Sequence, residues 1–291
     1  ERAVTRGGRT ARVETLGGAL VSSREERGME YIWGGDPAYW PGRNPLLFPI
    51  VGMRKEGKIR FDGREYAMER HGFARRREFT PAARGEDWVR LELRESAETL
   101  ALYPYSFRLA VEQRLTDTGF STAVTVANPG EGPLPFCLGA HTGFRCPLEA
   151  GERFEDYELV FPERESCPTL LLRDGLLDRP AALPCLEDTD TLPLDYRWFD
   201  ALDTLIFEGL RARSVTLRSR KSGRGVRVSF DGFPMLAFWT MPGKKAPYLC
   251  IEPWHGCAAG TAEGPEFTDK AHCIVLAPGE SRTLAYRADT L

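Results

Sequence analysis

The 291-residue sequence lacks several features that would indicate common classes of protein. Its seven cysteines are an odd number and form no Cys-x-x-Cys pair, which argues against a disulfide framework and a zinc ribbon. The longest apolar run, residues 45–51, is far too short to cross a bilayer. The net charge of −3 offers no basic surface for nucleic acid or an anionic membrane. We therefore expect a cytoplasmic protein with neither membrane nor nucleic-acid partners.

Sustained helical periodicity is also missing, and short period-two segments take its place. Val89, Leu91 and Leu93 alternate with charged residues, and similar alternation recurs at 107–112 and 226–231. This alternation is typical of strands with one face on a core and the other in water.

Turn signals separate these segments. Asp62-Gly63 predicts a tight hairpin, because this dipeptide readily adopts the positive φ angles of a primed turn. Residues 174–200, rich in Leu, Pro and Asp, are expected to form a long surface excursion with a short helix. The whole pattern predicts one all-β domain over residues 1–291, a sandwich or barrel of mostly antiparallel strands with a few short helices.

Histidine is scarce, with only four residues in the chain. His71 and His141 each lie in a glycine-containing segment that also carries a phenylalanine. Such segments form loops in which the backbone can approach a ligand closely. The alternative is a structural histidine whose ring is satisfied by backbone groups.

Glu252 follows the apolar segment that starts at Tyr248. Period-two alternation places Tyr248, Cys250 and Glu252 on one face of a strand. Pro253 cannot donate to a sheet ladder, so the strand is expected to end there, with the carboxylate beside Trp254. Burial at that place would raise the pKa of the carboxyl group. The alternative is a carboxylate at the rim, paired with an arginine.

Other reactive side chains form weaker patterns. His255, Cys257, His272 and Cys273 contain no close ligand pair with the usual zinc spacing, so no metal is expected. Cys257 near His255 suggests a thiol nucleophile, but nothing marks an oxyanion hole. Arg75–Arg77 are either a solvated surface or a grip for a phosphate. No cofactor is expected.

Six motifs, in the same order and over nearly the whole chain, resemble the aldose 1-epimerase (galactose mutarotase-like) family. They are Tyr39-Trp40-Pro41-Gly42 with 44–52, Asp62-Gly63-Arg64-Glu65-Tyr66, His71-Gly72-Phe73-Ala74-Arg75, Gly139-Ala140-His141, Asp203–Phe207, and Ile251–Gly256. The resemblance implies a galactose mutarotase-like β-supersandwich. It also implies an isomerase that interconverts the α and β anomers of an aldose.

The resemblance assigns roles to individual residues. Glu252 matches the general base of the family and His141 the general acid, while His71 matches a histidine near the ring oxygen of the sugar. The further sugar contacts that it implies are Arg75, Asp203, Arg54 and Trp254. A charged His141 is expected to lower the pKa of Glu252 and to have its own pKa raised, opposing the effect of burial.

Three alternatives stay open at this point. The chain could act on a hexose 6-phosphate, it could bind sugar without turnover, or it could be a glycosidase that uses Glu252 with Asp203. The expected partner is a small sugar in each case, and the protein could be a monomer or a homodimer.

The sequence departs from the family pattern at three places. Met53 stands where this branch often has arginine, and a shift to Arg54 would turn the side chain to the opposite face of a strand. Thr142-Gly143 replace a proline and an aromatic residue after His141. Residues 258–260, Ala-Ala-Gly, lie where the family often carries an aspartate.

Overall fold

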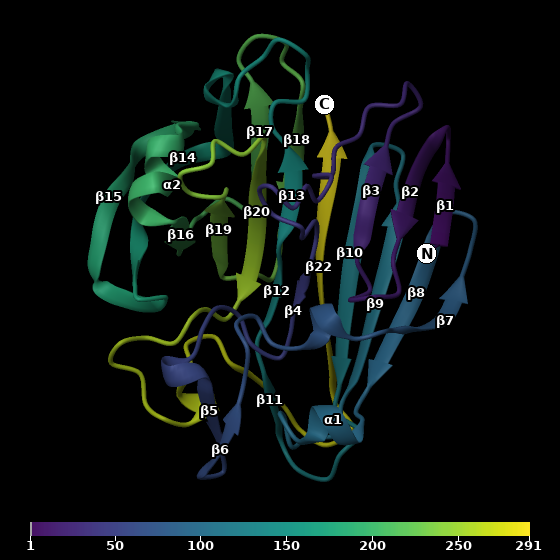
Figure 1. Cartoon of the computed structure of the whole chain (residues 1–291), viewed down its shortest axis with the longest axis vertical. Helices are drawn as coiled ribbons and strands as arrows, with labels where there is room; N and C mark the ends of the chain where they lie inside the picture. Colours follow the sequence, from purple (N-terminus) through teal and green to yellow (C-terminus); the bar gives the residue numbers. More distant parts are fainter. Residues whose placement is uncertain (1) are drawn as a thin grey trace.

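A computed structural model describes residues 2–291, and antiparallel strands make up most of it (Figure 1). Its main sheet has 15 strands. In spatial order these are β4 (Leu46–Leu47), β12 (Leu138–Ala140), β20 (Tyr248–His255), β19 (Met235–Trp239), β16 (Thr204–Glu208), β14 (Tyr157–Arg173), β17 (Ser214–Ser219), β18 (Gly225–Ser229), β22 (Ser281–Thr290), β10 (Gly119–Ala127), β9 (Arg108–Leu115), β8 (Trp88–Arg94) and β7 (Thr80–Arg84), with β13 (Thr142–Arg145) paired to β20 and β15 (Leu176–Pro193) to β14.

Smaller sheets complete the architecture. They are β1 (Arg2–Arg6), β2 (Arg9–Val13) and β3 (Leu20–Arg24), then β5 (Lys58–Phe61) with β6 (Arg64–Ala67), and β11 (Leu134–Phe136) with β21 (Ile274–Leu276). β1 and β2 contact β9, and β1 also contacts β8. The two α-helices, α1 (Ala97–Leu100) and α2 (Tyr196–Leu202), are short. The observed class is the predicted one, all-β with mostly antiparallel pairing.

The period-two segments form strands as predicted. They become β8, β9 and β18, and in β8 buried residues alternate with partly exposed ones along the strand. The predicted hairpin is β5–β6, and its turn residues Asp62 and Gly63 have φ values of 49° and 77°. These positive angles match a primed turn, which confirms the prediction.

The expected surface excursion at 174–200 is wrong in its main part. Residues 176–193 form β15, which pairs with β14 in a long hairpin, and α2 then supplies the short helix. The pairing of β14 with β15 shifts register at four places. Each shift resets which residues face inward, so no continuous period-two pattern remains to be read from the sequence.

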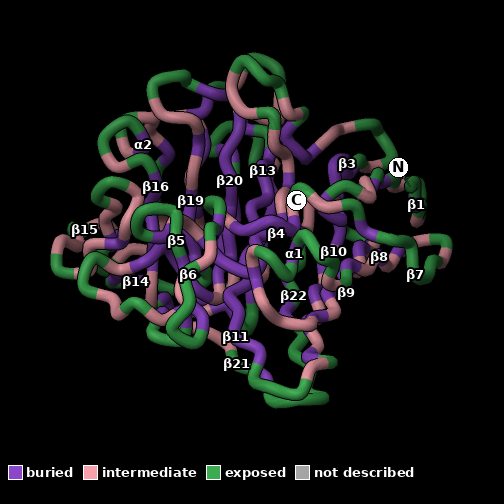
Figure 2. The backbone as a smooth tube through the Cα atoms, turned by 60° about the horizontal axis from the view of Figure 1, so that its bottom comes forward, coloured by how far each residue is buried: buried purple, intermediate pink, exposed green. Residues whose placement is uncertain are grey.

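The strands around β20 lie deep in the molecule (Figure 2). The first seven residues of β20 are all buried, as are the five residues Leu134–Leu138 that lead into β12. A polar side chain on these strands therefore loses contact with water. Within residues 2–291, no helix combines the length and apolar character needed to span a membrane.

Candidate active site

A cavity of about 590 Å³ gathers residues that are far apart in the sequence. Strands β16, β19 and β20 supply Thr204, Trp239 and Glu252, and the tip of the β14–β15 hairpin closes one side with Asp174 and Gly175. Six of the seven predicted site residues line this cavity. They are Glu252, His141, His71, Arg75, Asp203 and Trp254.

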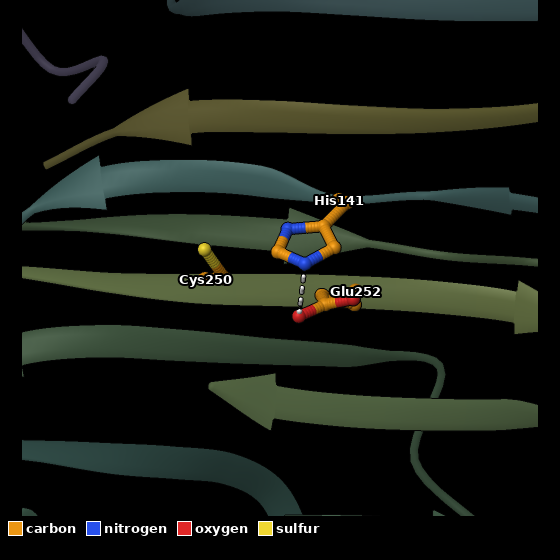
Figure 3. A group of neighbouring side chains, drawn as sticks. All are labelled: His141, Cys250 and Glu252. Carbon is orange, nitrogen blue, oxygen red and sulfur yellow. Dashed lines mark ion pairs between the residues drawn. The ribbon is translucent and has the colours of Figure 1, made fainter. Parts of the chain in front are cut away.

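Glu252 and His141 meet because they lie opposite each other on adjacent strands. β20 pairs with β12 before His141 and with β13 after it, and both stretches of pairing keep one register. Opposite side chains on neighbouring antiparallel strands point to the same face, with their Cβ atoms about 4.5–5.5 Å apart. Nε2 of His141 consequently lies 3.3 Å from Oε1 of Glu252 (Figure 3).

The strand that carries Glu252 does not end at Pro253, as the sequence predicted. β20 continues to His255. The shared register puts Pro253 opposite Ala140, at the point where β12 gives way to β13. The missing N–H of proline therefore falls where the ladder is already interrupted. Glu252 is in consequence inside a sheet, with 1% of its side chain exposed.

Burial dominates the electrostatics of this pair. It raises the pKa of Glu252 well above its ordinary value, although a hydrogen bond from Trp254 partly opposes this and Asp203 adds to it. Burial likewise lowers the pKa of His141 to about 3. In the ligand-free site, burial outweighs the opposing effect that was expected from pairing, because both groups are enclosed and the neutral form of each is favoured.

Trp254 and Asp203 flank the carboxylate. Nε1 of Trp254 donates to Oε2 of Glu252 over 3.2 Å, which fixes the orientation of the carboxyl group. Asp203 follows α2 with a φ of 63°, a value that is uncommon for a residue other than glycine. Its carboxylate accepts a hydrogen bond of 2.8 Å from the hydroxyl of Thr204. Such unfavourable backbone angles gather at functional sites, where surrounding structure maintains them.

His71 is held in one tautomer. The backbone N–H of Gly52 donates to its Nδ1 over 3.1 Å, so Nδ1 carries no proton. Burial, and then the charges of His141, Arg75 and Arg70, lower the pKa of His71 well below its ordinary value. A neutral ring with an unprotonated Nδ1 carries its proton on Nε2. His71 therefore offers a hydrogen-bond donor and no charge.

The departure at Thr142-Gly143 has a structural explanation. The Thr142 hydroxyl contacts Asn44 and Tyr286 in the interior. A Cβ at Gly143 would lie 3.0 Å from the Trp40 ring, so glycine leaves room for that ring. Trp40 packs against His141 with ring centres 4.9 Å apart. An aromatic residue thus still covers the histidine, but it comes from a different part of the chain.

Arg54 is the predicted contact that the structure does not place in the cavity. Its side chain is buried against Glu263, with 2.5 Å between Nη1 and Oε1. Met53 lines the cavity instead. The one-residue shift noted in the sequence therefore points the guanidinium away from the site, and the expected sugar contact of Arg54 is corrected.

His141 and Glu252, together with the neighbouring Cys250, have donor atoms that suit a metal ion. A nitrogen of His141, the sulfur of Cys250 and an oxygen of Glu252 lie within 4.8 Å of one another (Figure 3). This combination of nitrogen, sulfur and oxygen occurs in zinc sites. A cation bound there would occupy the atoms that acid–base chemistry requires, so the two uses exclude each other.

The sequence also offered His255 and His272 as possible metal ligands, but both rings have other partners. Nδ1 of His255 contacts the carbonyl oxygen of His272, and Nε2 of His272 lies 2.5 Å from Glu208. Burial raises the pKa of Cys257 to about 11, which leaves its thiol protonated and unsuited to act as a nucleophile.

Several cavity residues were not assigned to the site from the sequence. Arg70 lines the cavity directly before His71, and Trp40 and Trp239 form part of its wall. Asp174 belongs to the segment expected to be a surface excursion. Asp174-Gly175 is a dipeptide typical of hairpin turns and could have indicated this hairpin, but only the fold brings it to the cavity.

Comparisons with known proteins agree with this geometry. The family model described as "Aldose 1-epimerase" matches residues 3–288. The chain is 40% identical over 288 residues to the chromosomal protein LacX of Lactococcus lactis subsp. lactis, covering 95% of both chains.

Solved structures give the same result. A galactose mutarotase related enzyme from Lactobacillus acidophilus superposes with a TM-score of 0.95 at 26% identity, covering 100% of this chain and 97% of that one. A galactose mutarotase-like protein from Lactobacillus casei gives a TM-score of 0.91 at 28% identity, with 100% and 99% covered. The fold is the galactose mutarotase-like one, and the chain belongs to the aldose 1-epimerase family.

Proposed function

We propose that the protein is an aldose 1-epimerase that opens and closes the ring of a small sugar by acid–base catalysis. The observation that carries this proposal is the enclosed pair of His141 and Glu252, 3.3 Å apart in a cavity of suitable size. A binding protein has no need for a matched acid and base in that place.

Ring opening needs two proton transfers. Glu252, when ionised, removes the proton from the C1 hydroxyl, while protonated His141 donates a proton to the ring oxygen. The C1–O5 bond breaks and C1 becomes an aldehyde carbon. Rotation about the C1–C2 bond followed by the reverse transfers closes the ring to the other anomer. Each positioned transfer contributes roughly 10²–10⁴-fold to the rate.

The two steps use two proton arrangements of one pair. Ring opening starts from ionised Glu252 and protonated His141, whereas ring closure starts from the neutral forms of both. These arrangements hold the same number of protons and differ by one transfer. Burial favours the neutral arrangement in the empty cavity. A bound sugar must therefore stabilise the charged arrangement, to which the indole N–H of Trp254 contributes by its hydrogen bond to Glu252.

Saturation transfer between the C1 protons of the two anomers tests the proposal. We expect the wild type to accelerate exchange for at least one aldose, and His141→Ala to reduce that rate by about 100-fold or more. His272→Ala is the matched control, because this histidine also contacts a glutamate but lies outside the cavity. A sugar that binds the wild type without faster exchange would indicate a binding protein instead.

A further inference from the structure

Cys250 lies on the same face of β20 as Glu252 and close to His141. The register of β20 with β13 places Cys250 opposite Gly143, two residues beyond His141. Such diagonal neighbours on antiparallel strands are close enough for their side chains to meet. The sulfur of Cys250, a nitrogen of His141 and a carboxylate oxygen of Glu252 consequently lie within 4.8 Å of one another (Figure 3).

This cluster has donor atoms for a cation but no cationic side chain of its own. Within residues 2–291, no other three histidine, cysteine, aspartate or glutamate side chains bring their ligand atoms this close together. All three residues are buried, and no lysine or arginine of the described chain forms an ion pair with Glu252. Asp203 adds a further negative charge nearby, since it raises the pKa of Glu252.

The geometry is close to that of a tetrahedral ion. Zinc bonds of about 2.0–2.3 Å place neighbouring ligand atoms roughly 3.5 Å apart. Nε2 of His141 and Oε1 of Glu252 are already 3.3 Å apart, and a side-chain rotation that moves the thiol by roughly 1 Å completes the site. His141 and Glu252 line the cavity, which gives an ion a path to them. Nδ1 of His141 is buried without a hydrogen-bond partner among residues 2–291, so no second contact of that kind fixes the ring.

We propose that Cys250, His141 and Glu252 bind a divalent cation with the ligand preference of Zn²⁺, and that the bound ion inhibits the protein. A fourth ligand position is left to water, as is common where a protein supplies three zinc ligands. The ion occupies the carboxylate that would otherwise accept the C1 hydroxyl proton. The site is inferred from the geometry alone, whereas the inhibition rests on the proposed function.

The exchange of protons for the ion leaves the charge of this buried place unchanged. Burial raises the pKa of the Cys250 thiol and of the Glu252 carboxyl group, so both groups hold a proton in the ligand-free cavity. Binding releases these two protons and introduces one ion of charge +2, while neutral His141 contributes a lone pair. The buried cluster is neutral before and after binding, and it therefore avoids the large cost of an uncompensated buried charge.

Titration of the full chain with Co²⁺ alone tests the site, because a thiolate bound to cobalt gives a near-ultraviolet absorption band that does not depend on activity. We expect the wild type to show this band and Zn²⁺ to remove it by displacement. Cys250→Ala and Cys250→Ser should each lose the band and bind Zn²⁺ about 10-fold or more weakly, since loss of a ligand costs at least as much as loss of a residue that orients one. Cys257→Ala is the matched control and should keep the band, because Cys257 is also buried but lies outside the cluster.

Anomer exchange in the same samples tests the inhibition. Saturating Zn²⁺ should slow exchange by the wild type about 10-fold or more, and a chelator should restore the rate. Cys250→Ala should keep its rate without zinc and lose most of its sensitivity, whereas Cys257→Ala should stay sensitive.

The outcomes separate the site from the proposed function. A cobalt band that is absent from the wild type, or that persists in both Cys250 variants, overturns the site. A band together with exchange that zinc does not slow overturns the inhibition. A band in a chain that exchanges no aldose overturns the epimerase activity and leaves the metal site standing.

Discussion

Two histidine–glutamate pairs in this molecule have opposite electrostatic character. His141 and Glu252 are enclosed, and no arginine or lysine ion pair with Glu252 is present among residues 2–291. His272 and Glu208 are partly exposed, and Arg179 forms an additional ion pair with Glu208. Burial tends to raise the pKa of Glu208, but hydrogen bonds from Arg179 and His272 outweigh it, and the pKa is lowered.

The comparison shows that contact between the same two residue types does not define a function. A carboxylate with an arginine partner is held in its charged form and serves as an ion pair. A carboxylate that burial pushes toward its neutral form can exchange a proton with a bound ligand. The cationic partner of Glu208, and its absence at Glu252, account for the difference.

The largest expected difference between the pairs is in catalysis. Glu252→Gln should reduce anomer exchange by about 100-fold or more, because the amide cannot accept the C1 hydroxyl proton. Glu208→Gln should change the rate less than about 3-fold, since Glu208 does not line the cavity. Polarimetry on both variants measures this. Equal losses would show that the effect is structural rather than chemical.

Stability should change in opposite directions at neutral pH. Glu208→Gln loses its ion pair with Arg179, which is partly solvent-screened, and should lower the free energy of unfolding by about 1 kcal/mol. Glu252→Gln removes a carboxyl group whose charge is unfavourable in the fold, and should raise it by about 1 kcal/mol or more. Urea unfolding of both variants at pH 7 tests the signs, and a destabilised Glu252→Gln would contradict the account.

The pH dependence of stability should also have opposite signs. The pKa of Glu252 is raised in the fold, so its contribution is fully present below the unfolded pKa and is lost as pH rises through the folded pKa. The pKa of Glu208 is lowered, so its contribution is present above the unfolded pKa and is lost as pH falls through the folded pKa. Unfolding of each Gln variant relative to wild type, from about pH 2.5 to pH 8, measures both slopes. Slopes of the same sign would remove the distinction between the pairs.

The smallest effect is expected at Trp254. Trp254→Phe keeps an aromatic ring but removes the N–H that bonds to Glu252, so the pKa of the carboxyl group should rise further. We expect a loss of about 3- to 10-fold in kcat/KM and a shift of the alkaline limb of the pH profile to higher pH. A lower rate with an unmoved pH profile would indicate a packing role only.

The sequence predicted the regular parts of the fold. In β8 buried and partly exposed residues alternate along the whole strand, and the β5–β6 turn carries its own signal in Asp62-Gly63. The β14–β15 hairpin escaped prediction because its register shifts break the period. Period-two alternation in a sequence predicts a strand only where the pairing of that strand keeps one register.

The site could be predicted only in part. Glu252 was recognisable from its own strand, but His141 lies 111 residues earlier, and the register that joins them depends on the whole sheet. The family resemblance supplied that link. It did not reveal that Arg54 turns toward Glu263 or that the Trp40 ring fills the space at Gly143. Both depend on packing between distant segments.

The pH profile of kcat/KM for anomer exchange tests the central claim most directly, namely that His141 and Glu252 share one catalytic proton. The rate should fall in acid as His141 gains a second proton, at a pH below its ordinary pKa because burial lowers that value to about 3. It should fall in alkali as the pair loses its single proton, above the ordinary pKa of a glutamate. The result is a bell-shaped profile. An acid limb at or above the ordinary pKa of histidine, about 6.5, or a rate that does not fall in alkali, would contradict the claim.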